Sequence, residues 1–519
     1  MDIKLDDKFT LSKGFRFLTG SQALVRLALI QARKDKKNGI NSAGYISGYR
    51  GSPLGDYDKQ ILLNKNYLNK NNIFFQPGIN EELAATSLWG TQQSNFYGEG
   101  KYDGVFGIWY GKGPGVDRSG DALKHANLAG TSKNGGVLAL MGDDHICESS
   151  TTAHQSEFAM VDAMIPILNP SGIQEILDYG IYGIELSRQS GCWIAIKCVH
   201  DNVSSGATVD LDEERISIKK INKNLIPEEG LNIRKIDTAQ QKERRLHYHK
   251  LDVVKEFCRI NNINRYIYNS NKAKIGIVTT GKSFLDTIQA LEKLDINKKV
   301  ADKLGIRLLK MGMSWPLEPA IINEFAKGLY LIIVIEEKRS LIESQIKEIL
   351  FNKRSSLNIV GKHDIDGKIL FPSSWSLDPG MIATKIGELI FNKSGNEDLK
   401  TKVDEIENII QENRSIEAPK RTPYFCSGCP HNTSTQIPSE SRAVTGISCA
   451  FLVQGMERNN IGFTQMGCEG ANWVGESVFS NRDHIFQNIG DGTYIHSGIL
   501  SIRHAVAAKT KMTFKILYN

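Results

Sequence analysis

Short, almost continuously apolar runs bounded by glycine turns recur along this sequence, and they constrain its fold more than any other feature. Residues 135–142, 192–199, 274–281 and 329–336 are examples. Strands that are apolar on both faces are typical of parallel sheets covered on both sides. Helical patterns such as residues 21–34 alternate with these runs. The sequence therefore predicts a fold of the α/β class.

The chain has 519 residues, which is enough for about three domains. We expect one α/β domain at 14–215, a charged linker at 216–272, a second α/β domain at 273–395, a polar linker at 396–420 and a third domain at 421–519. This last domain stops on an apolar strand with no turn or helix after it. We therefore expect the chain to be an N-terminal piece of a longer protein.

Composition excludes several classes of protein. Hydrophobic residues make up 40% and charged residues 24% of the chain, and the net charge is only +6. Basic residues are interleaved with acidic ones, so nucleic acid is not an expected partner. No window approaches the roughly 18 consecutive apolar residues of a membrane span, and no signal peptide precedes the first domain. We expect a soluble, cytoplasmic protein.

A Gly-Asp-Gly sequence near the C-terminal end suggests a diphosphate site. Gly490, Asp491 and Gly492 follow an apolar run, and Asn519 ends the next one. Glycines let the backbone approach phosphates, and the two polar side chains offer oxygen ligands for a Mg²⁺ ion. This tripeptide alone is more typical of an ordinary turn. The position of Asn519 favours the diphosphate site.

Four cysteines crowd the same region and suggest a metal centre. Cys426, Cys429, Cys449 and Cys468 could hold a [4Fe-4S] cluster or, as the rival metal, zinc. Zinc ribbons usually show two close cysteine pairs, and the second pair is missing here, which favours the iron-sulfur cluster over zinc. In a third interpretation Cys449 and Cys468 are small buried apolar residues without a metal.

These motifs, with others earlier in the chain, resemble those of indolepyruvate ferredoxin oxidoreductases in their long, fused bacterial form. The matching stretches are Tyr49-Arg50-Gly51-Ser52-Pro53, residues 78–84, 111–117, 142–150, 425–432, 462–467 and 490–498. The resemblance implies three-layer thiamine diphosphate-binding folds. Residues 14–215 would be the pyrimidine-binding domain, 273–395 a transketolase C-terminal-like domain, and 421–519 an incomplete diphosphate-binding domain.

The resemblance also implies a reaction. It is the oxidative decarboxylation of indolepyruvate and other arylpyruvates to an aryl-acyl-CoA and CO2, with electrons passed through iron-sulfur clusters to ferredoxin. The implied cofactors are thiamine diphosphate, Mg²⁺ and a [4Fe-4S] cluster, and coenzyme A is a co-substrate. The family also implies a homodimer. The alternatives are a non-oxidative thiamine diphosphate decarboxylase or carboligase, and an inert fragment or assembly subunit.

Particular residues match the family's functional positions. Glu81 would be the glutamate that activates the cofactor, at the head of an alanine-rich helix reaching residue 90, with Glu82 as its competitor. Arg50 could pair with a substrate carboxylate, Ser52 keeps a hydroxyl at a substrate-contacting turn, and His431 could move protons.

The resemblance supports three of the four cysteines as cluster ligands. They are Cys426, Cys429 and Cys449. Cys468 departs from the family pattern, which has glycine there, so the fourth ligand is either Cys468 or a residue beyond 519. Outside these motifs, Glu336 and Glu337 follow an apolar run and are assigned to a surface turn without a role.

Overall fold

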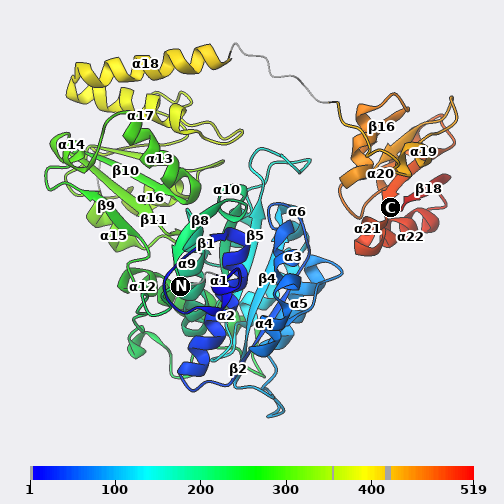
Figure 1. The fold of residues 1–519 in the computed structure, drawn as a ribbon, viewed down its shortest axis with the longest axis horizontal. Coiled ribbons are helices and arrows are strands. Elements are labelled where there is room, and N and C mark those ends of the chain that lie inside the picture. The colour runs from blue at the N-terminus through cyan, green and yellow to red at the C-terminus, as the bar shows by residue number, and fades with distance from the viewer. Residues whose placement is uncertain (1–3, 354–355, 415–421, 519) are drawn as a thin grey trace. The chain divides into compact units, whose positions relative to one another are not determined.

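The computed structural model of this chain describes residues 4–353, 356–414 and 422–518. The chain divides into two compact units, Met1–Ser415 and Ile416–Asn519 (Figure 1). Parallel sheets covered by helices dominate both units, so the predicted α/β class is confirmed. In the part of the chain that the structure describes, no helix combines the length and the apolarity needed to cross a bilayer.

The first unit contains a seven-stranded sheet whose neighbouring strands are parallel except for β12 beside β6. In spatial order its strands are β12 (Met313–Trp315), β6 (Ile167–Leu168), β7 (Ile194–Val199), β5 (Val137–Asp143), β4 (Gly104–Lys112), β2 (Ser42–Gly48) and β3 (Ile73–Phe75). Strands β5 and β7 are buried along their whole length. Their apolar character therefore has the cause expected from the sequence, which is cover on both faces.

Two layers of helices provide this cover. Helices α2 (Gly20–Lys37) and α9 (Ile173–Ser190) share one core with the sheet, and α5 (Glu81–Thr91) and α7 (Gly120–Ala129) share the core on the other face. The other helices before the second sheet are α1 (Asp7–Thr10), α3 (Gly55–Leu63), α4 (Lys65–Lys70), α6 (Gly113–Arg118), α8 (Glu157–Asp162), α10 (His200–Val203), α11 (Ala239–Arg245) and α12 (Leu251–Ile260). An antiparallel pair, β1 (Phe15–Thr19) with β8 (Gly206–Asp210), lies apart from the large sheet.

A five-stranded sheet completes the first unit. Its spatial order is β14 (Asn358–Val360), β13 (Leu331–Ile335), β10 (Ile275–Thr280), β11 (Ile306–Met311) and β9 (Arg265–Asn269), with only β9 antiparallel to its neighbour. Its helices are α13 (Gly281–Lys293), α14 (Lys298–Lys303), α15 (Pro319–Phe325), α16 (Ile342–Leu350), α17 (Pro379–Ser394) and α18 (Glu397–Arg414). Strand β12 follows β11 directly in the chain but pairs with β6, so the chain passes there from the five-stranded sheet into the seven-stranded one.

The second unit is a four-stranded parallel sheet with short helices. Its strands are, in order, β16 (Asn460–Phe463), β15 (Ala443–Thr445), β17 (Ile485–Gly490) and β18 (Met512–Leu517). Its helices are α19 (His431–Ser434), α20 (Ala471–Glu476), α21 (Asp491–Thr493) and α22 (Ile499–Ala507). The hydrophobic core of this unit is small and centres on Val444, Trp473 and Ile485.

Two helix-ending glycines offer a matched test of packing in the first unit. Gly191 ends α9 at φ 71°, and a Cβ there would lie 2.3 Å from the Leu231 carbonyl oxygen. Gly395 ends α17 at φ 62°, with no atom within 4 Å of such a Cβ. Alanine in this left-handed region costs about 1–2 kcal/mol. We expect Gly395→Ala to lose that amount of unfolding free energy in urea melts and Gly191→Ala to lose clearly more. Equal losses would contradict the predicted clash.

Candidate functional site

Glu81 lies at the first position of α5, where the chain leaves the carboxyl edge of the seven-stranded sheet. The side chain of Asn80 caps this helix and accepts a hydrogen bond from the Leu83 N–H at 2.9 Å. Glu81 is only 5% exposed, whereas Glu82 is exposed. The two candidate carboxylates of the sequence therefore occupy opposite environments, and only Glu81 is enclosed by protein.

Three residues, two in β4 and one in the following helix α6, surround Glu81. The indole N–H of Trp109 donates to the Glu81 carbonyl oxygen at 2.9 Å. A Cβ on Gly115 would lie 2.3 Å from Glu81 Oε1, and one on Gly111 would lie 3.3 Å from Glu81 Cγ. The Glu81 side chain thus occupies space that only glycine leaves open. A buried carboxylate at the carboxyl edge of a parallel sheet suits a ligand that offers it a hydrogen-bond donor, as the aminopyrimidine of thiamine diphosphate does.

Two neighbouring loops carry histidines and acids on the same edge. His154 packs against Gly113 and lies 3.4 Å from a carboxylate oxygen of Asp117. Burial lowers the pKa of His154, but the Asp117 carboxylate outweighs it and raises that pKa overall. Asp144 accepts hydrogen bonds from the N–H groups of residues 148 and 149 and from the Ser150 hydroxyl. These bonds stabilise the loop after β5.

Arg50 and Ser52 follow strand β2. Arg50 lines a cavity of about 530 Å³ beside the ends of β2 and β3. Ser52 is exposed and is not among the residues that line this cavity. Gly78 lines it too, and its N–H donates to the Gly48 carbonyl oxygen at 2.9 Å. Because Glu81 follows Gly78 closely in the chain, one short segment connects the cavity with the buried carboxylate.

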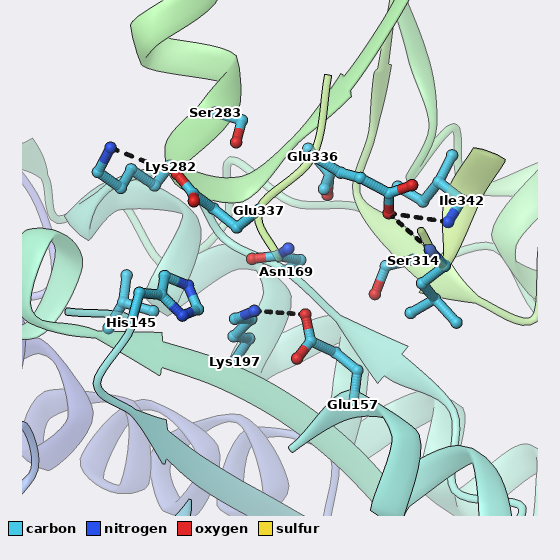
Figure 2. Close-up of a pocket in the computed structure, with 13 residues that line it drawn as sticks. His145, Glu157, Asn169, Lys197, Lys282, Ser283, Ser314, Glu336, Glu337 and Ile342 are labelled. Atoms are coloured by element: carbon cyan, nitrogen blue, oxygen red, sulfur yellow. Dashed lines mark hydrogen bonds and ion pairs between the residues drawn. The ribbon is translucent and has the colours of Figure 1, made fainter. Parts of the chain in front are cut away.

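A second cavity lies where the two sheets of the first unit meet (Figure 2). Its volume is about 20 Å³, which is enough for roughly one water molecule and too little for a substrate. Lys197 and Glu157 form an ion pair at its wall, and Glu336 accepts hydrogen bonds from N–H groups at the start of α16. Burial raises the pKa of Glu336 to about 6 despite these bonds.

The assignment of Glu336 and Glu337 to a surface turn is wrong. Their exposed fractions are only 4% and 8%. The backbone N–H groups of the α16 N-terminus satisfy Glu336, while Leu377 N–H and Lys282 face Glu337. Charged residues usually lie at the surface because burying an unpaired charge costs free energy. Here hydrogen bonds and a nearby cation offset that cost, and the partners of Glu337 are distant from it in the sequence.

In the second unit, Asp491 follows β17 and begins α21. Its carboxylate accepts the Gly492 N–H at 2.7 Å, and both Asp491 and Gly490 are half-buried. His431 is 3% exposed and packs edge-on against Phe425. Burial lowers the pKa of His431, and the nearby Asp491 charge opposes this. The Asp491 carboxylate is therefore close enough to His431 to act on it electrostatically, although the two residues are 60 positions apart in the sequence. Asn519 lies outside the described residues.

The four cysteines do not form a preassembled metal centre. Cys426 and Cys449 are exposed, and Cys429 and Cys468 are half-buried. Within residues 4–353, 356–414 and 422–518, no three His, Cys, Asp or Glu side chains lie close enough together to hold a metal ion. As placed, these residues do not fit a cluster. The interpretation of Cys449 and Cys468 as buried apolar residues is wrong, because Cys449 is exposed and Cys468 is only half-buried. The cluster on the four cysteines stays a prediction.

The sequence analysis missed the residues that surround the expected ones. Trp109 and Gly115 had no assigned role, although residues 111–117 are one of the stretches that match the family. Asp58 and Lys65 line the larger cavity beside Arg50, and nothing in the local sequence distinguishes them from surface residues of a helix.

Comparison with known proteins identifies the relatives of this chain. Residues 265–413 match the family model described as the indolepyruvate oxidoreductase domain. The indolepyruvate oxidoreductase subunit IorA of Methanothermobacter marburgensis is 24% identical over 100% of this chain and 77% of the relative. IorA of Pyrococcus abyssi is 22% identical over 97% of this chain and 74% of the relative.

A solved structure shares the fold. A 2-oxoglutarate:ferredoxin oxidoreductase from Magnetococcus marinus, with 2-oxoglutarate, coenzyme A and succinyl-CoA bound, superimposes with a TM-score of 0.52 at 14% identity, over 73% of this chain and 66% of that one. At 14% identity the solved structure shows the shared fold alone, and the curated relatives are named as subunits of an oxidoreductase. The resemblance seen in the sequence is confirmed: residues 265–413 match the model of the indolepyruvate oxidoreductase domain, and the chain is similar along its whole length to the IorA subunit of Methanothermobacter marburgensis.

Proposed function

We propose that this chain is the thiamine diphosphate-binding part of a cytoplasmic arylpyruvate:ferredoxin oxidoreductase. It would oxidatively decarboxylate indolepyruvate and related arylpyruvates to the aryl-acyl-CoA and CO2, with ferredoxin as electron acceptor. The observation that carries this proposal is the buried Glu81 carboxylate, enclosed by Gly115 and Trp109 at the carboxyl edge of a parallel sheet. The names of the IorA relatives support the choice of substrate.

The proposed roles follow from what each residue can do. Bound thiamine diphosphate would supply a carbon nucleophile for the 2-oxo group. Glu81 would hold a proton at its carboxylate and keep the pyrimidine in place, because its side chain has little room to move. Arg50 would bind the substrate carboxylate, and Ser52 would offer a hydroxyl to the substrate at the same turn.

The second unit would bind the diphosphate end of the cofactor. Gly490 and Gly492 leave the backbone accessible at the end of β17, and Asp491 would bind Mg²⁺, with Asn519 as the proposed second ligand. His431 would take up or release a proton beside the Asp491 carboxylate. Coenzyme A and a homodimeric assembly belong to this proposal through the resemblance. A [4Fe-4S] cluster on the four cysteines rests on their spacing and the resemblance alone, and we derive no step from it.

Titration of the full chain with thiamine diphosphate and Mg²⁺, followed by calorimetry, tests the cofactor. We expect saturable binding that weakens when Mg²⁺ is removed with a chelator, because the diphosphate needs a bridging cation. An absence of binding would favour the inert fragment or assembly subunit.

Product analysis tests the reaction class. Anaerobic protein supplied with indolepyruvate, coenzyme A and a viologen dye in place of ferredoxin should release CO2, reduce the dye and form the acyl-CoA. An aldehyde without dye reduction would instead support the non-oxidative decarboxylase.

A further inference from the structure

The small cavity where the two sheets of the first unit meet brings three buried polar side chains together (Figure 2). Glu157, Ser283 and Ser314 line it, and their exposed fractions are only 5%, 1% and 1%. Within the part of the chain that the structure describes, Glu157 Oε2, Ser283 Oγ and Ser314 Oγ have no hydrogen-bond partner. A buried polar atom without a partner costs free energy. Three such atoms at one cavity therefore point to an occupant that bonds to them.

The three side chains reach the cavity from both sheets. Glu157 begins α8, which lies between strands β5 and β6 in the chain, and Ser314 lies in β12, which pairs with β6. Ser283 lies in the first turn of α13, directly after β10 of the five-stranded sheet. An occupant bonded to all three side chains would therefore link the seven-stranded sheet to the five-stranded one.

The charged groups of the cavity wall are satisfied by the protein. Lys197 donates a hydrogen bond to the other carboxylate oxygen of Glu157, Oε1. Lys282 lies 3.5 Å from a carboxylate oxygen of Glu337, and three backbone N–H groups at the start of α16 donate to Glu336. Within the described ranges, no three His, Cys, Asp or Glu side chains are grouped closely enough to hold a metal ion. The occupant is therefore expected to be a neutral molecule.

The volume of the cavity limits the occupant to one very small molecule. This volume is about 20 Å³, and a single water molecule needs roughly 10–15 Å³ together with two to four polar partners. We infer that the cavity binds one water molecule, which donates a hydrogen bond to Glu157 Oε2 and accepts one from each hydroxyl of Ser283 and Ser314. This water ties the two sheets of the first unit together. The inference does not depend on the proposed function.

The sign of a stability change tests this inference. With the water bound, Ser283→Ala and Ser314→Ala should each raise the equilibrium constant of unfolding of the full chain by roughly 5- to 30-fold in urea melts, because each removes a hydrogen bond to the water. In a dry cavity each substitution would instead remove an unpaired hydroxyl that costs free energy. The equilibrium constant would then stay the same or fall, and that result would overturn the inference.

Ser119→Ala is the matched control. The Ser119 hydroxyl is also fully buried and, among the described residues, lacks a hydrogen-bond partner, but Ser119 does not line this cavity. Its removal should leave the equilibrium constant of unfolding unchanged or lower it. A rise as large as that from Ser283→Ala would show that the loss of any buried serine hydroxyl destabilises the chain, and the inference would fall.

Two further measurements locate the water. The double variant Ser283→Ala/Ser314→Ala should raise the equilibrium constant of unfolding by less than the product of the two single effects, because both hydroxyls bond to the same molecule. A crystal structure of the full chain should show one water within hydrogen-bond distance of Glu157 and of both serines. Strictly multiplicative effects, an empty cavity or an ion in place of the water would each contradict the inference.

Discussion

Glu81→Gln is expected to remove nearly all turnover of arylpyruvate, by roughly 10²–10⁴-fold, while the chain stays folded. The substitution keeps the shape of the side chain, so the contacts with Gly115 and Gly111 remain. It removes the ability to hold and release a proton at the carboxylate. The measurement is kcat for dye reduction with indolepyruvate, combined with a urea melt to verify that stability is preserved.

Glu82→Gln is the matched control for this prediction. Both glutamates lie in the first turn of α5, so each substitution removes the same favourable interaction between a negative charge and the helix N-terminus. Only Glu81 is buried. A turnover loss confined to Glu81→Gln would therefore reflect its chemistry. An equal loss from both variants, or none from Glu81→Gln, would contradict the role proposed for Glu81.

The sequence predicted the layers of this fold well because local signals determine them. The apolar runs at 135–142 and 192–199 became the fully buried strands β5 and β7. The alanine-rich helix expected from Glu81 to residue 90 spans Glu81–Thr91, because Asn80 provides a side-chain cap at its start. Capping and periodicity act within a few residues, so they can be recognised without a structure.

The surroundings of the candidate site could not be predicted in the same way. Gly115 meets Glu81 although the two residues lie in different helices, and Asp58 of α3 lines the same cavity as Gly48 at the end of β2. Contacts of this kind depend on tertiary structure, and no local pattern encodes them. Spacing predicted that the four cysteines could share a metal, yet their positions in the structure do not bring three of them together.

Gly115→Ala is expected to lower kcat by roughly 100-fold with little change in stability. The added Cβ would lie 2.3 Å from Glu81 Oε1 and 2.5 Å from both Cδ and Cγ, so an atom has to move. Those atoms belong to the flexible end of a side chain, and the backbone φ of Gly115 is not positive. The carboxylate therefore moves while the fold stays in place, and alanine within α6 is favourable for a helix.

Two further variants distinguish a displaced Glu81 carboxylate from a general loss of folding stability. Gly120→Ala at the start of α7 adds a Cβ with nothing within 4 Å, and it should leave both kcat and the urea midpoint unchanged. Glu81→Asp shortens the side chain and makes room for the new methyl group, so combining it with Gly115→Ala should reduce kcat by less than the product of the two single effects. Strictly multiplicative losses would mean that Gly115 does not position Glu81. A loss of kcat that only parallels a loss of unfolding free energy would mean that Gly115 serves the fold instead of the reaction.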